Sequence, residues 1–219
     1  MYKLVMLRHG QSSYNAERRF TGWSDPDLTP EGMMEARVAG RILRREGYTF
    51  DVAFVSMLRR AIKTLCAVLD EMDLLWIPVR KSWMLNERHY GELEGQVIDD
   101  VPDELKRYRH SFDIRPPALP DDDPRHPRFD RRYRDLGRHP AGESIRDVQE
   151  RLLILWTHEI APEILSGRRV IVTTHANVIR AFMNHMEGVP TEGLTVPTGR
   201  PIVYELGDRL EPLRRYCLQ

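Results

Sequence analysis

The chain has 219 residues, 41% of them apolar, and its 33 basic residues balance its 33 acidic residues. This length and composition fit one domain spanning residues 1–219 with a sizeable hydrophobic core. The balanced charge excludes the basic field that nucleic-acid binding needs, and no apolar run approaches the roughly 20 residues of a membrane span.

Residues 3–7 form the first apolar run, and this run ends at Arg8, His9 and Gly10. The pattern predicts a buried strand followed by a tight turn. Open α/β sheets bind their ligands at the carboxyl ends of their strands. Arg8 can hold a phosphate or a carboxylate through two parallel hydrogen bonds, so this turn is a candidate site.

The next third of the chain contains signals for helices and strands in alternation. Thr29 is expected to cap a helix that begins at Pro30. An apolar run at 50–55 predicts a second strand, which leads into a helix that carries Arg60 in its first turn. Residues 76–79 are expected to form a third, short strand.

The pattern changes between about 99 and 139, where proline is frequent and charges are dense. We interpret this stretch as a short helix followed by a long irregular excursion, which is typical of an insertion or a lid. Ser144 is then expected to cap a long amphipathic helix. The β-branched run at 169–174 predicts a central strand that leads directly to His175.

Two further strands, near 202–206 and 213–216, close the chain. Because strands alternate with helices, the expected fold is α/β, a three-layer α/β/α sandwich with a mostly parallel central sheet. The carboxyl ends of parallel strands meet at one edge, which would gather His9, Arg60 and His175.

Two imidazoles and several guanidiniums, with Glu87 on a nearby loop, suit phosphoryl transfer. Metal sites favour histidine and carboxylates without crowding cations, so no metal is expected here. A neutral imidazole can act as a nucleophile, and a carboxyl group can pass the proton. The alternative from another class is a non-catalytic protein that binds phosphorylated ligands.

Several short strings together resemble the cofactor-dependent phosphoglycerate mutases of the histidine phosphatase superfamily. The resemblance covers nearly the whole chain, from residue 1 to about 216. It is carried by RHG at 8–10, FTGW at 20–23, LRRA at 58–61, LNERHYG at 85–91, GES at 142–144, THAN at 174–177 and PTGRP at 197–201.

The resemblance implies that His9 is the nucleophile and becomes phosphorylated. Arg8, Arg60 and His175 would hold the phosphoryl group, and Glu87 would be the general acid and base. The residues implied to contact the phosphate and carboxylate of the substrate are Ser12, Asn15, Thr21, Gly22, Arg88, Tyr90, Arg109, Ala176 and Asn177.

The implied reaction interconverts 3-phosphoglycerate and 2-phosphoglycerate, with 2,3-bisphosphoglycerate as the phosphoryl primer and no metal. The substrate would be a small phosphorylated three-carbon acid, and the family is often a homodimer. Cys66 and Cys217 lie far apart and in no metal-binding spacing, which is typical of a cytoplasmic protein.

Two departures from the family pattern support an alternative substrate. Ile98 aligns with a substrate-binding lysine of the family, and His110 stands where the second of two adjacent arginines is usual. A branched alkyl group cannot bind an anion, and a histidine carries only part of a charge near neutral pH. The alternative is therefore a histidine phosphatase that hydrolyses another small phosphate ester in a reshaped distal subsite.

Overall fold

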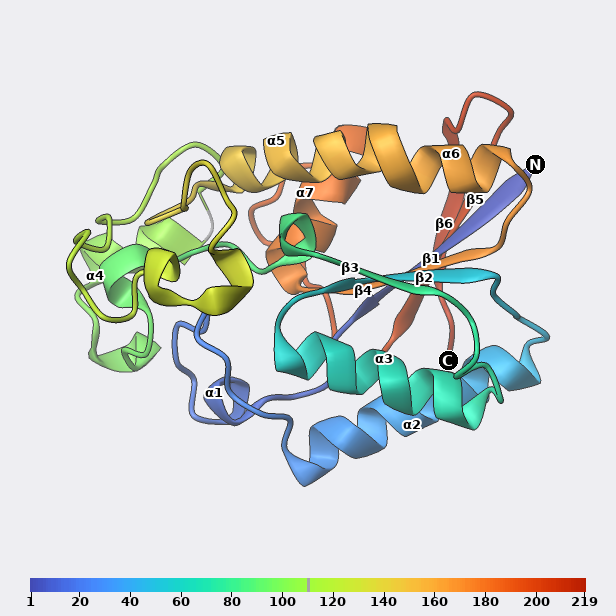
Figure 1. Ribbon diagram of the computed structural model, residues 1–219, viewed down its shortest axis with the longest axis horizontal. Helices are drawn as coiled ribbons and strands as arrows, with labels where there is room; N and C mark the ends of the chain where they lie inside the picture. The colour runs from blue at the N-terminus through green and yellow to red at the C-terminus, as the bar shows by residue number, and fades with distance from the viewer. Residues whose placement is uncertain (110) are drawn as a thin grey trace.

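The computed structural model describes residues 1–109 and 111–219, and a six-stranded sheet with the order β3-β2-β4-β1-β5-β6 lies at its centre (Figure 1). Strands β3, β2, β4 and β1 run parallel, whereas β5 and β6 are antiparallel additions. The mostly parallel sheet predicted from the sequence is confirmed. The strands are β1 Tyr2–Arg8, β2 Val52–Ser56, β3 Val79–Ser82, β4 Val170–Thr174, β5 Pro201–Leu206 and β6 Pro212–Cys217.

Helices cover both faces of the sheet and complete the three layers (Figure 1). One face packs against α2 and α3, and the other packs against α5, α6 and α7. Among the described residues, no helix has the length and apolar composition that crossing a bilayer requires. The helices are α1 Ser13–Ala16, α2 Pro30–Arg45, α3 Arg59–Glu71, α4 Asp103–Lys106, α5 Ile145–Leu155, α6 Ala161–Leu165 and α7 Ala176–Glu187.

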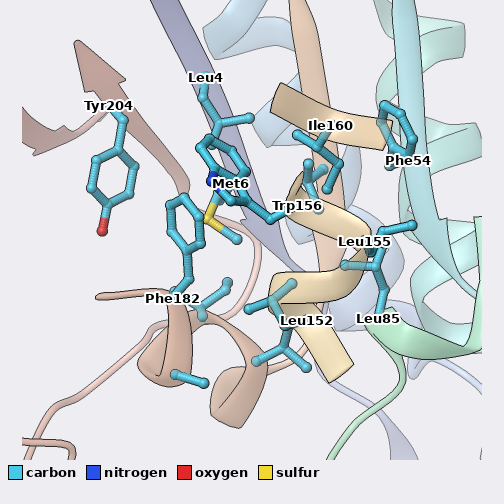
Figure 2. Packing of buried hydrophobic residues seen from close by; sticks show 14 of the residues in the cluster. Leu4, Met6, Phe54, Leu85, Leu152, Leu155, Trp156, Ile160, Phe182 and Tyr204 are labelled. Carbon is cyan, nitrogen blue, oxygen red and sulfur yellow. The ribbon is translucent and has the colours of Figure 1, made fainter. Parts of the chain in front are cut away.

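The side chains of β1 alternate between two apolar cores, as the two-residue period of a strand requires. Leu4 and Met6 belong to the core under α5 and α7, and Figure 2 shows them with Phe182 of α7. Val5 and Leu7 belong to the core formed with α2 and α3. Because β1 is buried on both faces, it reads as a continuous apolar run in the sequence.

The helix starts follow the capping signals in the sequence. Thr29 Oγ1 accepts a hydrogen bond from Gly32 N at 3.0 Å, and α2 begins at Pro30 as expected. Ser144 and Asp147 form a reciprocal capping box at the start of α5. The long helix predicted after Ser144 is interrupted by a π-helical turn at Trp156–Ile160 before α6 continues it.

The third strand lies three residues later than predicted, at Val79–Ser82 instead of 76–79. Trp76 is 76% exposed and precedes the strand. Strand β3 is at an edge of the sheet and pairs only with β2, so its own side chains are largely exposed. An exposed edge strand has no apolar pattern that could reveal it in the sequence. Trp76 wrongly predicts the start of the strand because it is apolar, although it is exposed.

The excursion between about 99 and 139 has the irregular character that the sequence predicts. It lies at the same end of the molecule as α1 and the start of α5 (Figure 1). Leu119 and Tyr133 are buried, and Leu119 N donates to Ala141 O at 2.7 Å. Among its described residues, the regular parts besides α4 are short 3₁₀ turns at Ile98–Asp100, Arg107–Arg109, Pro127–Phe129 and Arg131–Tyr133.

The turn after β1 packs backbone against backbone on the first turn of α2. A Cβ atom at Gly32 would lie 2.0 Å from Gln11 O, and one at Gly10 would lie 2.1 Å from Gly32 O. Gly32→Ala should therefore destabilise the fold by about 1–3 kcal/mol, because neither backbone can move aside.

Thermal unfolding followed by circular dichroism measures this loss, and each kcal/mol should lower Tm by roughly 2–4 °C. Gly137→Ala is the matched control, because a Cβ atom there would meet nothing within 4 Å. Equal Tm values for the two variants would contradict the backbone contact.

Candidate active site

Strands β1, β2 and β4 bring three polar segments to one edge of the sheet, as predicted from their order. His9 follows β1 and His175 follows β4, and their ring centroids are 4.9 Å apart. Arg60 lies in the first turn of α3, directly after β2, with its Nε 3.3 Å from His9 Nε2. Arg8, the last residue of β1, completes a cluster of two imidazoles and two guanidiniums.

The hydrogen bonds of His9 fix which ring nitrogen is available for chemistry. Its Nδ1 lies 2.7 Å from Gly10 O, and a carbonyl oxygen only accepts, so Nδ1 carries the proton. Burial, with the nearby charges of Arg60 and Arg8, holds the pKa of His9 well below its ordinary value of 6.5. The ring is therefore neutral at pH 7, and Nε2 presents a lone pair.

A chain of hydrogen bonds fixes the other imidazole. Met57 N donates to Asn86 Oδ1 at 2.9 Å, which sets the orientation of that amide. The Ser56 hydroxyl then donates to the same oxygen and accepts from His175 Nε2 at 2.8 Å. Burial, followed by the charge of Arg60, lowers the pKa of His175 well below 6.5. Among the described residues its Nδ1 has no partner.

Arg60 is fully buried and is held by carbonyl oxygens instead of carboxylates. Its Nη1 and Nη2 donate to Ser24 O and Gly22 O, each at 2.8 Å. Burial lowers the pKa of Arg60 to about 10, so the side chain stays charged at neutral pH. Arg8 likewise donates to Val196 O, and burial lowers its pKa.

Glu87 is buried beside the start of α7. Its Oε1 accepts hydrogen bonds from Arg88 N at 2.8 Å and from Asn177 N at 3.3 Å. Its negative charge opposes the effect of burial on the pKa values of Arg8 and Arg60. The carboxylate is thus electrostatically coupled to the cationic cluster.

A buried ion pair supports the loop that carries Glu87. Arg151 of α5 binds the carboxylate of Glu143 through Nε at 2.8 Å and Nη2 at 3.0 Å. The same guanidinium donates to the carbonyl oxygens of Met84, Asn86 and Glu87. Neither residue was predicted from the sequence to be a positioning residue. The two lie only eight residues apart, but the loop that Arg151 supports through its carbonyl contacts is 64–67 residues away in the chain.

A cavity of about 240 Å³ opens beside the cluster. Its lining includes Arg8, Glu87 and Gly22, whose carbonyl binds Arg60. The predicted contact residues that line it are Asn15, Thr21, Gly22, Tyr90, Arg109, Ala176 and Asn177. His9, Arg60 and His175 lie behind this lining and are almost fully buried.

Two of the predicted contact residues do not line the cavity. Ser12 is fully buried and caps α1 in a reciprocal capping box with Asn15. Arg88 donates from Nε to Glu143 O and from Nη2 to Ile114 O at 2.9 Å. Both hold the local backbone. His110, expected at the distal subsite, lies outside the described residues.

The cavity wall also contains arginines that were not predicted from the sequence, namely Arg18, Arg19 and Arg180. Arg180 is three residues after Asn177 on α7, and its Nη1 donates to Asn177 Oδ1 at 2.9 Å. The helical spacing of these two residues was the signal that could have found it. Within 1–109 and 111–219, no group of three or more histidine, cysteine or acidic side chains could hold a metal ion.

The low pKa values of His9 and His175 link stability to pH. Below pH 6.5 the unfolded chain binds protons that these buried rings do not, so stability falls as the pH is lowered through this value. Each ring can contribute up to about 1.4 kcal/mol per pH unit. We expect the free energy of unfolding to fall steeply between pH 6.5 and 5.

Urea unfolding at a series of pH values measures this slope. His9→Asn should make it shallower, whereas His158→Asn should leave it unchanged because His158 is exposed on the π-helical turn. An identical slope in the wild type and the His9 variant would contradict the neutral, buried state of His9.

Solved structures with a similar fold come from several bacteria. A mycobacterial glucosyl-3-phosphoglycerate phosphatase in complex with VO3 is 24% identical with a TM-score of 0.72, over 99% of this chain and 97% of that one. An Escherichia coli protein described as a putative α-ribazole-5′-P phosphatase is 20% identical with a TM-score of 0.70, over 98% and 96%. The protein TTHB049 of Thermus thermophilus is 25% identical with a TM-score of 0.64, over 99% of each chain.

The family model described as "Histidine phosphatase superfamily (branch 1)" matches residues 4–200, a span that contains His9, Arg60, Glu87 and His175. This span covers most of the chain and every segment of the cluster. The chain therefore belongs to branch 1 of the histidine phosphatase superfamily.

Proposed function

We propose that this enzyme hydrolyses a small phosphate monoester through a phosphorylated His9. The observation that carries the proposal is the neutral His9, whose Nε2 lone pair lies among the buried cations Arg8 and Arg60. A neutral imidazole can attack phosphorus, and fixed cations stabilise the charge on the equatorial oxygens.

The reaction takes two steps. In the first, Glu87 enters as the protonated carboxylic acid; His9 Nε2 attacks the phosphorus atom, the P–O ester bond breaks, and the departing oxygen takes the proton of Glu87. In the second, Glu87 takes a proton from water as the water oxygen attacks phosphorus, the N–P bond breaks, and inorganic phosphate leaves. His175 Nδ1, which has no partner among the described residues, is available to bind a phosphoryl oxygen once it is protonated.

Two observations favour hydrolysis over transfer within a three-carbon acid. Ile98, which aligns with a substrate-binding lysine of the mutases, lines the cavity and offers no charge there. Two of the similar structures are phosphatases by name, one for glucosyl-3-phosphoglycerate and one for α-ribazole-5′-P. A subsite without the lysine binds a bisphosphorylated acid less tightly and leaves water free to accept the phosphoryl group.

A phosphoglycerate mutase is the second candidate. The mutase-like strings in the sequence favour it, and so does Arg109, which lines the cavity where such an enzyme would hold a distal anion. In that case 2,3-bisphosphoglycerate would phosphorylate His9, and 3-phosphoglycerate would be converted to 2-phosphoglycerate. Formation of 2-phosphoglycerate in a coupled assay, without release of inorganic phosphate, would support the mutase and contradict hydrolysis.

A panel of phosphate monoesters tests the proposed hydrolysis, with released phosphate as the readout. Glu87→Gln should lower kcat by about 10²–10⁴-fold on alkyl esters, because the departing alkoxide then lacks its proton donor. On p-nitrophenyl phosphate, the same variant should lose much less of the rate of the first step, because the p-nitrophenolate leaves without being protonated.

His9→Ala should abolish turnover on every ester, whereas His185→Ala should keep it because His185 is exposed in the last turn of α7. Undiminished phosphate release by the His9 variant would contradict the proposal.

A further inference from the structure

The lining of the cavity carries more positive charge than one phosphoryl group requires. Arg18, Arg19, Arg109 and Arg180 line it, and Glu87 is the one carboxylate in the described lining. None of these four arginines contacts His9 or His175 in the cluster described above. They are therefore candidates to bind a second part of the substrate, and two of them, Arg18 and Arg19, are paired with the carboxylates of Asp99 and Glu17.

The side chains of two of these arginines are held in place by neighbouring residues, of which only Asn177 lines the cavity. Arg19 donates from Nη1 to Gly95 O at 2.8 Å and from Nε to Glu17 at 2.6 Å. Arg180 donates to Leu194 O at 2.7 Å and to Asn177. These contacts fix both guanidiniums as parts of the wall.

Arg18 differs because its guanidinium is bound by an exposed carboxylate. Its Nε and Nη2 donate to Asp99 at 2.8 and 2.9 Å, and the two side chains are 65% and 60% exposed. The hydrogen bond from Arg18, followed by the charges of Arg18, Lys106 and Arg109, lowers the pKa of Asp99. The Asp99 carboxylate therefore binds the Arg18 guanidinium and also feels the positive charges of Lys106 and Arg109.

The backbone places Arg18 at this position under strain. Its φ is +54°, in the left-handed region that a side chain other than glycine enters at a cost of about 1–2 kcal/mol. Ile98 N donates to Arg18 O at 2.8 Å, and Phe20 N donates to Gln96 O at 3.0 Å. These bonds join residues 18–20 to residues 96–98. The backbone of Arg18 is therefore held firmly, while its guanidinium is exposed.

We propose that Arg18 is a specificity-determining residue that binds a carboxylate of the substrate, and that Asp99 occupies its guanidinium when no substrate is bound. The inference rests on the proposed function and specifies that the phosphate ester also carries a carboxylate. A substrate carboxylate can form the same two parallel hydrogen bonds that Asp99 forms now. The exchange leaves Asp99 exposed to water, so no buried charge is left unpaired.

Two matched esters test the carboxylate. 3-Phosphoglycerate and glycerol 3-phosphate share a three-carbon backbone, and only the first carries a carboxylate. We expect the wild type to prefer 3-phosphoglycerate in kcat/KM, and Arg18→Gln to reduce this preference about five- to tenfold, mainly through KM.

Arg18→Lys should retain part of the preference because it keeps the charge but loses the paired geometry. Asp99→Asn should increase the preference about threefold, because a neutral amide competes less well for Arg18.

A second exposed ion pair provides the matched control. Arg44 and Asp73 are 2.8 Å apart and are 61% and 73% exposed, and neither lines the cavity. Arg44→Gln and Asp73→Asn should leave the preference unchanged. Calorimetric titration of each variant with 3-phosphoglycerate provides a readout that does not depend on turnover. Arg18→Gln should raise the Kd for 3-phosphoglycerate by about the same factor as it raises KM.

The outcomes separate this inference from the proposed function. If Arg18→Gln lowered kcat/KM equally on both esters, or left the Kd for 3-phosphoglycerate unchanged, the role of Arg18 would be overturned even if phosphate is released normally. Weaker binding by Arg18→Gln without any phosphate release in the wild type would support the role of Arg18 and overturn hydrolysis.

Discussion

The parallel pairing of β1 with β4 is the contact on which the whole site depends. Arg8 is in register with Thr174, and His9 N extends the ladder by donating to Thr174 O at 3.0 Å. This pairing sets the two histidines, one near each end of the sequence, beside each other. Strand β2 on the other side of β4 then brings Arg60 to the same edge, so the topology of the sheet alone assembles the cluster.

Burial of the cluster explains both its protonation and its affinity for anions. Desolvation keeps His9 neutral, yet the same desolvation leaves Arg8 and Arg60 charged because a guanidinium titrates so far above neutrality. The two guanidiniums donate to neutral carbonyl oxygens, including Gly22 O, instead of carboxylates. Among the described residues the buried Nε of Arg8 has no partner at all. Their positive charge is therefore not cancelled by a direct ion pair and can be offered to a phosphoryl group.

The sequence predicts those features that depend on neighbouring residues or on strand order. The capping by Thr29, the central strands and the edge that carries His9 are of this kind, because periodicity and turn chemistry are local. The contacts of Arg151 with the carbonyl oxygens at 84–87 were missed because long-range packing creates them, and the same holds for the place of Arg18 and Arg19 in the cavity lining. The mutase-like strings are consistent with the superfamily, but none of them contains Ile98 or the arginines that line the rest of the cavity, so they do not specify that part of the lining.

The most direct test of the central claim is to locate the phosphoryl group on the enzyme itself. Mixing the enzyme with a slowly hydrolysed ester, quenching in base and recording the ³¹P spectrum distinguishes phosphorylation at the two imidazole nitrogens. Because His9 Nδ1 carries a proton that it donates to Gly10 O, the account predicts one phosphoryl group, on Nε2 of His9. A phosphoryl group on His175 or on Nδ1, or a quenched enzyme without phosphorus during turnover, would contradict it.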